Sequence, residues 1–282
     1  MTRGFLEKGV LAGLVFMTGF AVFIFALVLA EVAVRGGGAL NAGFFLEEAR
    51  DFGAAGGVRY QMEGTLLLMV GAAALGLPLA LAGALFQTEY VDAPGLKRGL
   101  RLLVYSMNGV PTILFGLLGY LFFGITLGAG VSWLTGVLIL AIMILPTIQV
   151  SVQEAIEALP EQYREAAGAL GLSRWQVVRS IVLPHCLYGI VTGTLLGLAR
   201  AAGETAAILF TATAFSGARF PEAMSDPVPT LQTHILVLAQ EALNPRTIEN
   251  AWGAGLVLLC LVFSLIALSL VFRGRLSMEF ER

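Results

Sequence analysis

The chain of 282 residues has few of the residue types on which disulfide scaffolds, metal sites and nucleic-acid surfaces depend. It contains two cysteines and two histidines, none of them at the spacing of metal ligands, so a disulfide-rich scaffold and a metalloprotein are excluded. Its lysines occur only at Lys8 and Lys97, and no GxxxxGKS or GxxxxGKT loop for ATP phosphates is present. A net charge of −2 without a basic block also excludes a nucleic-acid-binding protein.

Charged residues are scarce as well. Asp, Glu, Lys and Arg together make up 13% of the chain, against roughly 25% in an average soluble domain. Hydrophobic residues make up 57%. A water-soluble domain of this size still exposes about a quarter of the surface of its unfolded chain, so it cannot hide so much apolar surface. The composition therefore predicts an integral membrane protein.

Six apolar segments are long enough to cross a bilayer, which needs about 20 apolar residues per helix. The first exceeds the apolar core of a signal peptide, roughly 7–15 residues, and we interpret it as a retained span. Only a Gly-rich turn at 128–130 separates the third from the fourth, which predicts an antiparallel hairpin. The expected fold is all-α, a polytopic membrane protein with six transmembrane helices in a single domain over residues 1–282. The segments are 9–34, 64–86, 103–127, 131–153, 185–215 and 252–272.

Basic residues are concentrated on one side of these spans. With six spans both termini lie on the same side, and the positive-inside rule assigns the basic flanks to the cytoplasm. Two long outer loops follow, 35–63 and 216–251, the second with a helical apolar pattern from Pro229 to Ala242 that is typical of a short surface or re-entrant helix. The inner set is Arg3, Lys8, Lys97, Arg98, Arg101, Arg164, Arg174, Arg179, Arg273, Arg275 and Arg282, and the outer set is Arg35, Arg50, Arg59, Arg219 and Arg246.

Residues 159–184, between the fourth and fifth spans, have the pattern of a helix–turn–helix. Pro160 suits the first helical position, and Gly171 is placed to end that helix in a left-handed cap. Ser173 and Gln176 predict a capping box at the start of the next helix. A small apolar stripe on the first helix suits insertion into a groove on another protein, while a hairpin lying on the bilayer or on the chain's own bundle is the alternative. The stripe consists of Tyr163, Ala166, Ala167 and Leu170.

Three motifs carry a resemblance to a known family. The first is Glu165-Ala166-Ala167, three residues, Gly171, nine residues, Ile181, one residue and Leu183-Pro184, which resembles without mismatch the EAA signature of ABC-importer permeases. Asn108–Gly116 and Leu198–Ala206 resemble the GVPSIVFG-type and RAxGETA segments of the A-type permeases of phosphate-specific importers. The chain departs from these segments at Thr112, where Ser is common, and at Ala207, where Pro often follows.

The resemblance covers nearly the whole chain and implies a type I ABC-importer permease in a bacterial cytoplasmic (inner) membrane. It implies a heterodimer with a related C-type permease, two ATPase subunits beneath, an extracytoplasmic phosphate-binding protein outside, and phosphate as the substrate. The chain would be a transport subunit without catalytic residues or a cofactor of its own, because ATP and Mg²⁺ are used by the ATPase partners. Residues 159–184 would form the cytoplasmic coupling element, with Tyr163, Arg164, Glu165, Ala166, Ala167, Gly168, Leu170 and Gly171 at the ATPase.

Arg200 and Glu204 are the charged residues that lie well inside a predicted span. An ionisable side chain there costs at least a few kcal/mol and normally faces a partner or a water-filled cavity. Arg can bind phosphate through two parallel hydrogen bonds, and we expect a switched pair, in which Glu204 or charges of the partner permease neutralise Arg200 until phosphate arrives. The alternative is an interhelical ion pair that holds the heterodimer together. Other polar residues expected near the pathway are Thr205, Thr211, Asn108 and Thr112.

Three other functions stay open at this stage. The first is an ABC importer for another oxyanion, namely molybdate, sulfate or phosphonate. A multi-pass membrane enzyme, such as a lipid phosphatase, would need a cluster of His, Ser or carboxylate residues at one membrane face, and none is evident. A passive channel would not need the coupling element. Glu89 and Asp92, in the cytoplasmic turn after the second span, are interpreted as solvated loop residues.

Overall fold

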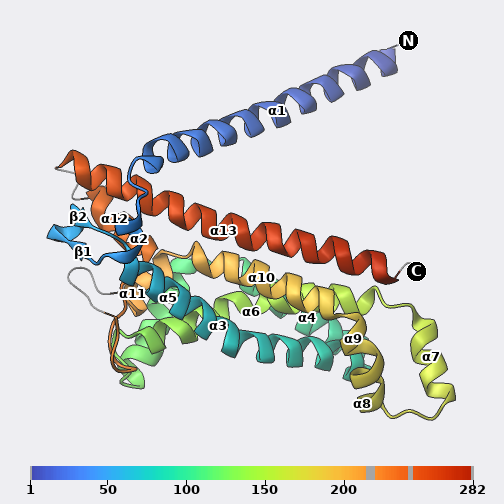
Figure 1. Ribbon diagram of the computed structural model, residues 1–282. Helices are drawn as coiled ribbons and strands as arrows, with labels where there is room; N and C mark the ends of the chain where they lie inside the picture. The colour runs from blue at the N-terminus through green and yellow to red at the C-terminus, as the bar shows by residue number, and fades with distance from the viewer. Residues whose placement is uncertain (1, 214–219, 241–243, 281–282) are drawn as a thin grey trace.

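The computed structural model describes residues 2–213, 220–240 and 244–280, and these are almost entirely helical (Figure 1). Arg219, Ala242 and Arg282 lie outside the described residues, as do the side chains of Arg3, Lys8, Arg273 and Arg275. The α-helices are α1 (Thr2–Gly37), α2 (Ala42–Leu46), α3 (Arg59–Leu85), α4 (Pro94–Asn108), α5 (Thr112–Gly119), α6 (Trp133–Glu157), α7 (Glu161–Ala169), α8 (Arg174–Val177), α9 (Leu183–His185), α10 (Leu187–Ala202), α11 (Ala206–Thr211), α12 (Leu231–Gln240) and α13 (Pro245–Phe280). Three π-helical turns, η2 (Phe86–Tyr90), η3 (Tyr120–Thr126) and η4 (Val178–Val182), extend neighbouring helices, and η1 (Asp51–Gly53) is a 3₁₀ turn between β1 (Ala49–Arg50) and β2 (Ala55–Gly56), which pair antiparallel.

Helix α6 forms the centre of the bundle, between α3 and α10. Helix α10 approaches α6 closely through Gly193 and Gly197, which have the GxxxG spacing of membrane helix contacts. A Cβ atom at Gly193 would lie 2.7 Å from the Cβ atom of Ser151, so a larger residue would push the two helices apart. Apolar side chains recur every fourth residue along α6 and are buried in this core: Leu140, Ile144, Ile148, Val152 and Ile156.

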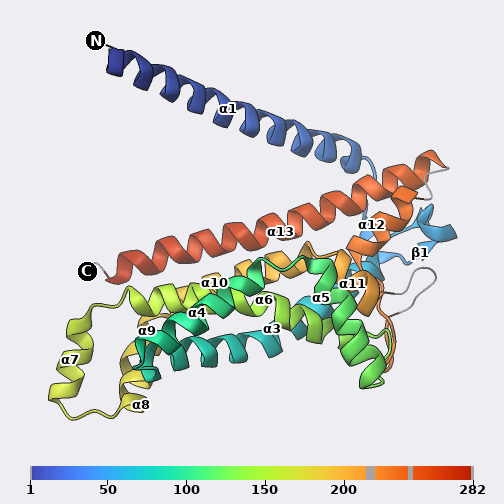
Figure 2. The same cartoon turned by 180° about the vertical axis from the view of Figure 1, so that it is seen from behind.

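Helix α1 leaves the bundle, and the residues of its apolar stretch are not buried by the rest of the chain (Figures 1 and 2). It meets α13 near its end, where a Cβ atom at Gly36 would lie 2.6 Å from the carbonyl oxygen of Trp252. The start of α1, the end of α13 and helices α7 and α8 lie at one end of the molecule, and the two strands with α2 and α12 lie at the other (Figure 1). Both termini and residues 159–184 therefore share an end, in the arrangement that the charge pattern predicts.

Four of the predicted spans are single helices long enough to cross a membrane, α1, α3 with η2, α6 and α13, and the count reaches six if each bent pair is one span. The all-α polytopic class is thus confirmed for the described residues. The segment 103–127 is not one straight helix: α4 ends at Asn108, and α5 with η3 departs at 94°. Pro111 lacks an N–H group and disfavours helical backbone at Val110, which explains the break. Both halves contact α6, and α5 also packs on α11.

The segment 185–215 is interrupted as well. It bends by 64° at Cys186 and again loses its helix after Ala202, before the short α11 begins at Ala206. Helix α12 matches the short helix predicted in the second outer loop. It is packed into the bundle rather than laid on the surface, because Leu231 and Leu238 are fully buried against α13 and neighbouring elements.

Candidate functional site

The predicted helix–turn–helix is present, and we call residues 159–184 the coupling segment. Helix α7 starts at Glu161, with Pro160 one position earlier than expected, in the N-cap. Gly171 has φ = +76°, and the N–H groups of Gly171 and Leu172 donate to the carbonyls of Gly168 (2.9 Å) and Ala167 (3.1 Å). These two bonds form a Schellman motif, so the left-handed end of the helix is confirmed.

The second helix begins as its sequence predicts. Gln176 Oε1 accepts the backbone N–H of Ser173 at 2.8 Å, and the two residues form the expected capping box. From there α8, η4 and α9 run on to His185, where the chain bends into α10. The ring of His185 lies 5.3 Å from that of Tyr163, so α7 and α9 are in contact.

The apolar stripe of α7 is divided between two environments. Ala167 is 2% exposed, whereas Leu170 is 80% exposed at the free end of the helix. Glu165 and Ala166 are exposed too, and α7 stands away from the bundle in Figure 1. The expectation of one continuous contact face is therefore corrected: Ala167 supports the turn from within, and the exposed residues are the ones that can meet a partner.

Arg164 turns inward rather than toward a partner. Its side chain is 21% exposed and donates to Glu89 Oε1 at 2.9 Å, to Glu161 at 3.2 Å, and to the carbonyl of Ile156 at 3.1 Å. Burial by itself lowers the pKa of Arg164, but the carboxylates of Glu89 and Glu161 outweigh it and raise the pKa above its ordinary value. The guanidinium group thus stays charged in this position.

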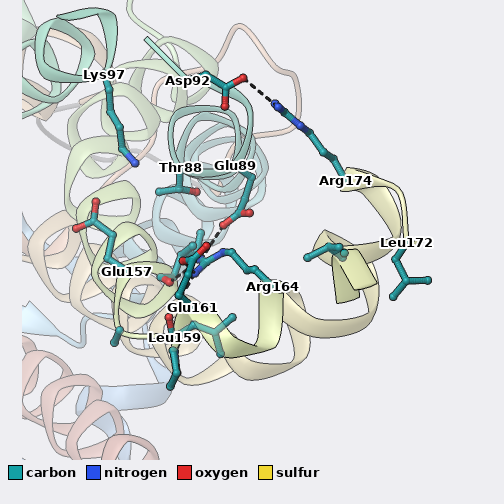
Figure 3. Close-up of a pocket in the computed structure, with 15 residues that line it drawn as sticks. Thr88, Glu89, Asp92, Lys97, Glu157, Leu159, Glu161, Arg164, Leu172 and Arg174 are labelled. Atoms are coloured by element: carbon teal, nitrogen blue, oxygen red, sulfur yellow. Dashed lines mark hydrogen bonds and ion pairs between the residues drawn. The ribbon is translucent and has the colours of Figure 1, made fainter. Parts of the chain in front are cut away.

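Arg164 and Glu89 face a groove of about 780 Å³ between the coupling segment, the end of α6 and the turn after α3 (Figure 3). The expectation that Glu89 is solvated is wrong, since its side chain is 10% exposed and paired with Arg164. Asp92 is 78% exposed, as expected, and pairs with Arg174 at 2.9 Å. Sequence reasoning missed both pairs because their members are 75 and 82 positions apart, beyond any local pattern.

A buried cluster of glutamines lies behind Glu89. Gln87, in the same π-helical turn, accepts hydrogen bonds from Gln149 Nε2 (3.3 Å) and from Gln153 Nε2, both on α6. Its own amide donates to the backbone carbonyl of Lys97 on α4 at 3.2 Å. The turn η2 is therefore fixed to α6 and α4 as well as to the coupling segment.

Arg200 lies where α10, α4 and α6 meet. Its Nη1 donates to Asn108 Oδ1 at 2.8 Å and to Thr147 Oγ1 at 3.2 Å. In the described part of the chain it forms no ion pair, and its Nη2 and Nε groups bind no protein acceptor. Arg200 is thus held by two neutral acceptors and keeps donors for an anion. Asn108 was expected at this place, whereas Thr147 was missed, because a hydroxyl in an apolar span carries no distinguishing signal.

Glu204 does not pair with Arg200 in this structure. Helix α10 ends at Ala202, so the two residues are not one turn apart on a continuous helix. Glu204 is buried, and its Oε1 accepts the N–H of Ala207 at 3.1 Å. The carboxylate therefore satisfies a free N–H group of α11, which explains why it turns away from the arginine.

The remaining predicted pathway residues lie beyond the two helix breaks. Thr205 is the N-cap residue of α11, and Thr112 is the first residue of α5; both are partly buried. Thr211 is buried, and its hydroxyl donates to the carbonyl of Ala207 at 2.8 Å, so it is engaged within its own helix. The structure brings Asn108 to Arg200 and shows no hydrogen bond from these three described threonines to the arginine.

The two breaks, at 109–111 and 203–205, lie side by side. Before them, Asn108 contacts Arg200; after them, α5 packs on α11 so closely that a Cβ atom at Gly116 would lie 2.7 Å from the Cα atom of Ala207. Non-helical backbone at membrane depth is tolerated only inside protein or along a water-filled cavity. Gly109 and Gly203 are exposed in this chain, so the paired breaks and Arg200 form a polar strip on the face of the bundle.

Comparison with known proteins identifies relatives along most of the chain. Residues 76–278 match the family described as binding-protein-dependent transport system inner membrane component. The chain is 29% identical to the probable ABC transporter permease protein YqgI of Bacillus subtilis, covering 89% of this chain and 91% of that protein. It is 34% identical to the probable phosphate transport system permease protein PstA of Methanocaldococcus jannaschii, covering 74% and 73%.

Among solved structures, the fold matches a chain in the crystal structure of a bacterial alginate ABC transporter in complex with an alginate pentasaccharide-bound periplasmic protein. The TM-score is 0.64 at 15% identity, covering 95% of this chain and 93% of that chain. A second match, with a TM-score of 0.55 at 18% identity, is the MetNI methionine ABC transporter in inward-facing conformations, covering 78% and 94%. At these identities the two structures establish the fold alone.

Proposed function

Because the chain belongs to the family of binding-protein-dependent transport system inner membrane components, we propose that it forms the phosphate pathway of an ATP-driven importer. It is a permease subunit of an ABC importer, a transport subunit rather than an enzyme. The substrate assignment is supported by relatives at 31–34% identity that are named phosphate transport system permease proteins. We place the chain in the bacterial inner membrane with both termini in the cytoplasm.

Arg200 is the observation that carries the substrate class. The guanidinium group is held by neutral acceptors rather than by a carboxylate, and its remaining donors match the oxygens of a tetrahedral oxyanion. Asn108 and Thr147 can exchange a bond to the arginine for one to the anion. Binding must stay weak so that the anion can be released. In the described residues no second cation lies beside Arg200, which suits transient binding during transport better than tight binding.

The coupling segment supports the remaining partners. Two ATPase subunits would receive the exposed side of α7, with Glu165, Ala166 and Leu170, and would use ATP and Mg²⁺. A related C-type permease would complete the pathway, and an extracytoplasmic phosphate-binding protein would deliver the anion. Closure of the ATPases would drive the coupling segments together and open the permease pair outward, and hydrolysis would reset it.

Uptake of labelled phosphate by proteoliposomes with the complete importer tests this function. Wild type is compared with Arg200→Gln and Gly171→Asp. Arg35→Gln is the control, since Arg35 is an exposed arginine at the end of α1, where it pairs with Glu31 and lies over the ring of Trp252. We expect energised uptake in wild type and control, and its loss in both test variants although the complex assembles. If the importer takes up molybdate or sulfate instead of phosphate, its substrate is another oxyanion. Unchanged uptake by Arg200→Gln would remove Arg200 from the pathway.

A further inference from the structure

Arg164 of α7 contacts two other elements, the end of α6 and the turn η2. From α7 its guanidinium group reaches the backbone carbonyls of Ile156 (3.1 Å) and Leu159 (3.3 Å) at the end of α6. The last carbonyls of a helix lack intrahelical partners and favour a cation, so this side chain caps α6. The same guanidinium group binds Glu89 in η2 at 2.9 Å.

Glu89 is the residue that makes this connection specific. Of the two acidic residues in the turn after α3, Asp92 is open to solvent, where an ion pair contributes little. Glu89 is mostly buried beside Arg164, and a carboxylate withdrawn from water needs its partner. The two pairs thus have the same chemistry at different exposure, which makes one a matched control for the other.

The turn η2 is fixed on its other side by the glutamine cluster. Gln87 lies two residues before Glu89 and accepts from Gln149 and Gln153 of α6, all buried. A movement of α7 therefore reaches α3 and α6 through side-chain contacts as well as through the linker at 158–160. In Figure 3 Glu89 and Arg164 meet inside the groove, with Asp92 and Arg174 at its rim.

We propose that Glu89 is a positioning residue for energy coupling. By holding Arg164 it locks α7 to the turn η2, so that the coupling helix and the α3–α4 turn move as one body when the ATPases close. This inference rests on the proposed function only in taking α7 as the element that the ATPases move. It assigns Arg164 to transmission within the chain, and it leaves contact with the ATPase to the exposed residues Glu165, Ala166 and Leu170.

Pulsed electron paramagnetic resonance on the complete importer tests the lock without reference to the substrate. Spin labels are placed at Gln162→Cys on α7 and Tyr90→Cys in η2, both exposed, after Cys186 and Cys260 are replaced by alanine. We expect the same label distance without nucleotide and after trapping with ATP and vanadate. In Glu89→Ala we expect the distribution of label distances to broaden and shift after trapping with ATP and vanadate, while Asp92→Ala behaves as wild type. A distance that changes in the wild type, or equal behaviour of the two variants, would overturn the proposal.

The ratio of phosphate carried to ATP hydrolysed gives a second readout that general destabilisation does not move. We expect Glu89→Ala to retain ATPase activity but to carry about fivefold less phosphate per ATP, the ratio equivalent to about 1 kcal/mol. Glu89→Gln keeps the shape of the side chain, and is used if the alanine variant fails to assemble; it should lower the ratio in the same direction. An unchanged ratio in both variants refutes the lock. If wild type carries no phosphate while the label distance stays constant, the substrate assignment fails and the lock stands.

Discussion

Replacing Gly171 and Gly168 by alanine, one at a time, tests how the coupling segment is held in shape. Gly171 has φ = +76° in the turn that ends α7, whereas Gly168 lies within the helix. An added Cβ atom would meet nothing within 4 Å at either position, so packing contributes to neither change. The two substitutions are chemically identical and differ only in the backbone conformation that alanine must adopt.

The expected effects have opposite sign. Alanine in the left-handed conformation costs about 1–2 kcal/mol, so Gly171→Ala weakens the Schellman turn. Alanine in a helix interior is favoured over glycine by about 1 kcal/mol, so Gly168→Ala strengthens α7. The variants therefore differ by at least about 2 kcal/mol in local stability, which corresponds to roughly 30-fold in an opening equilibrium.

Hydrogen–deuterium exchange of the purified full chain measures this difference in local stability at the turn that ends α7. The amide of Leu172 donates to Ala167 at 3.1 Å, and that of Leu170 donates to Ala166 at 3.2 Å, so both report opening of the turn. The ATPase subunits are left out, because their binding would itself protect α7. Faster exchange in Gly171→Ala and slower exchange in Gly168→Ala are expected. A shift in the same direction for both variants would refute the reasoning.

Three further predictions follow from single contacts. Glu204→Ala should lower the free energy of unfolding by about 1 kcal/mol by removing the acceptor for Ala207, whereas Glu204→Gln should stay near wild type; equal losses in thermal unfolding would contradict the cap. Thr147→Val should raise the KM for uptake several-fold, and Thr147→Ser should restore it, since one hydrogen bond to Arg200 contributes about 1 kcal/mol; a change in kcat alone would contradict this. Burial lowers the pKa of His234 to about 4, so the unfolded chain binds its proton first and stability falls as pH drops from 6.5 toward 4. The free energy of unfolding falls by about 2 kcal/mol at pH 5, and this loss should be absent in His234→Gln. Parallel pH profiles of thermal unfolding in wild type and His234→Gln would exclude this effect of His234.

Local features of the coupling segment could be predicted because each depends on residues a few positions apart. Gly171 marks the end of α7 since other residues avoid its backbone conformation, and Ser173 with Gln176 marks the next start. The helix breaks were harder to place. Pro78 and Pro146 lie inside the intact helices α3 and α6, whereas Pro111 lies in the break between α4 and α5. A proline inside a predicted span therefore does not by itself indicate whether the helix breaks there.

The inner contacts of the site could not be predicted from spacing. Glu89 and Arg164 meet only because the end of α3 and the end of α6 lie together, and that proximity is a property of the whole bundle. Arg200 and Glu204 show the opposite case. Their separation by four positions predicts contact, but the helix ends between them, and the backbone N–H of Ala207 takes the carboxylate. Tertiary structure thus supplied one ion pair and removed another.

The break after α10 also explains why the outer helix α12 is buried. Ending a helix at Ala202 leaves its carbonyl without an intrahelical donor inside the bundle, where water is scarce. Gln232 of α12 donates its Nε2 to that carbonyl, and its Oε1 accepts from Thr65 of α3 at 3.3 Å. Helix α12 of the second outer loop thereby stabilises the end of α10, next to the break in which Gly203 is exposed. Because Gln232 connects the end of α10 to α3, we expect a change at Gln232 to disturb the break itself.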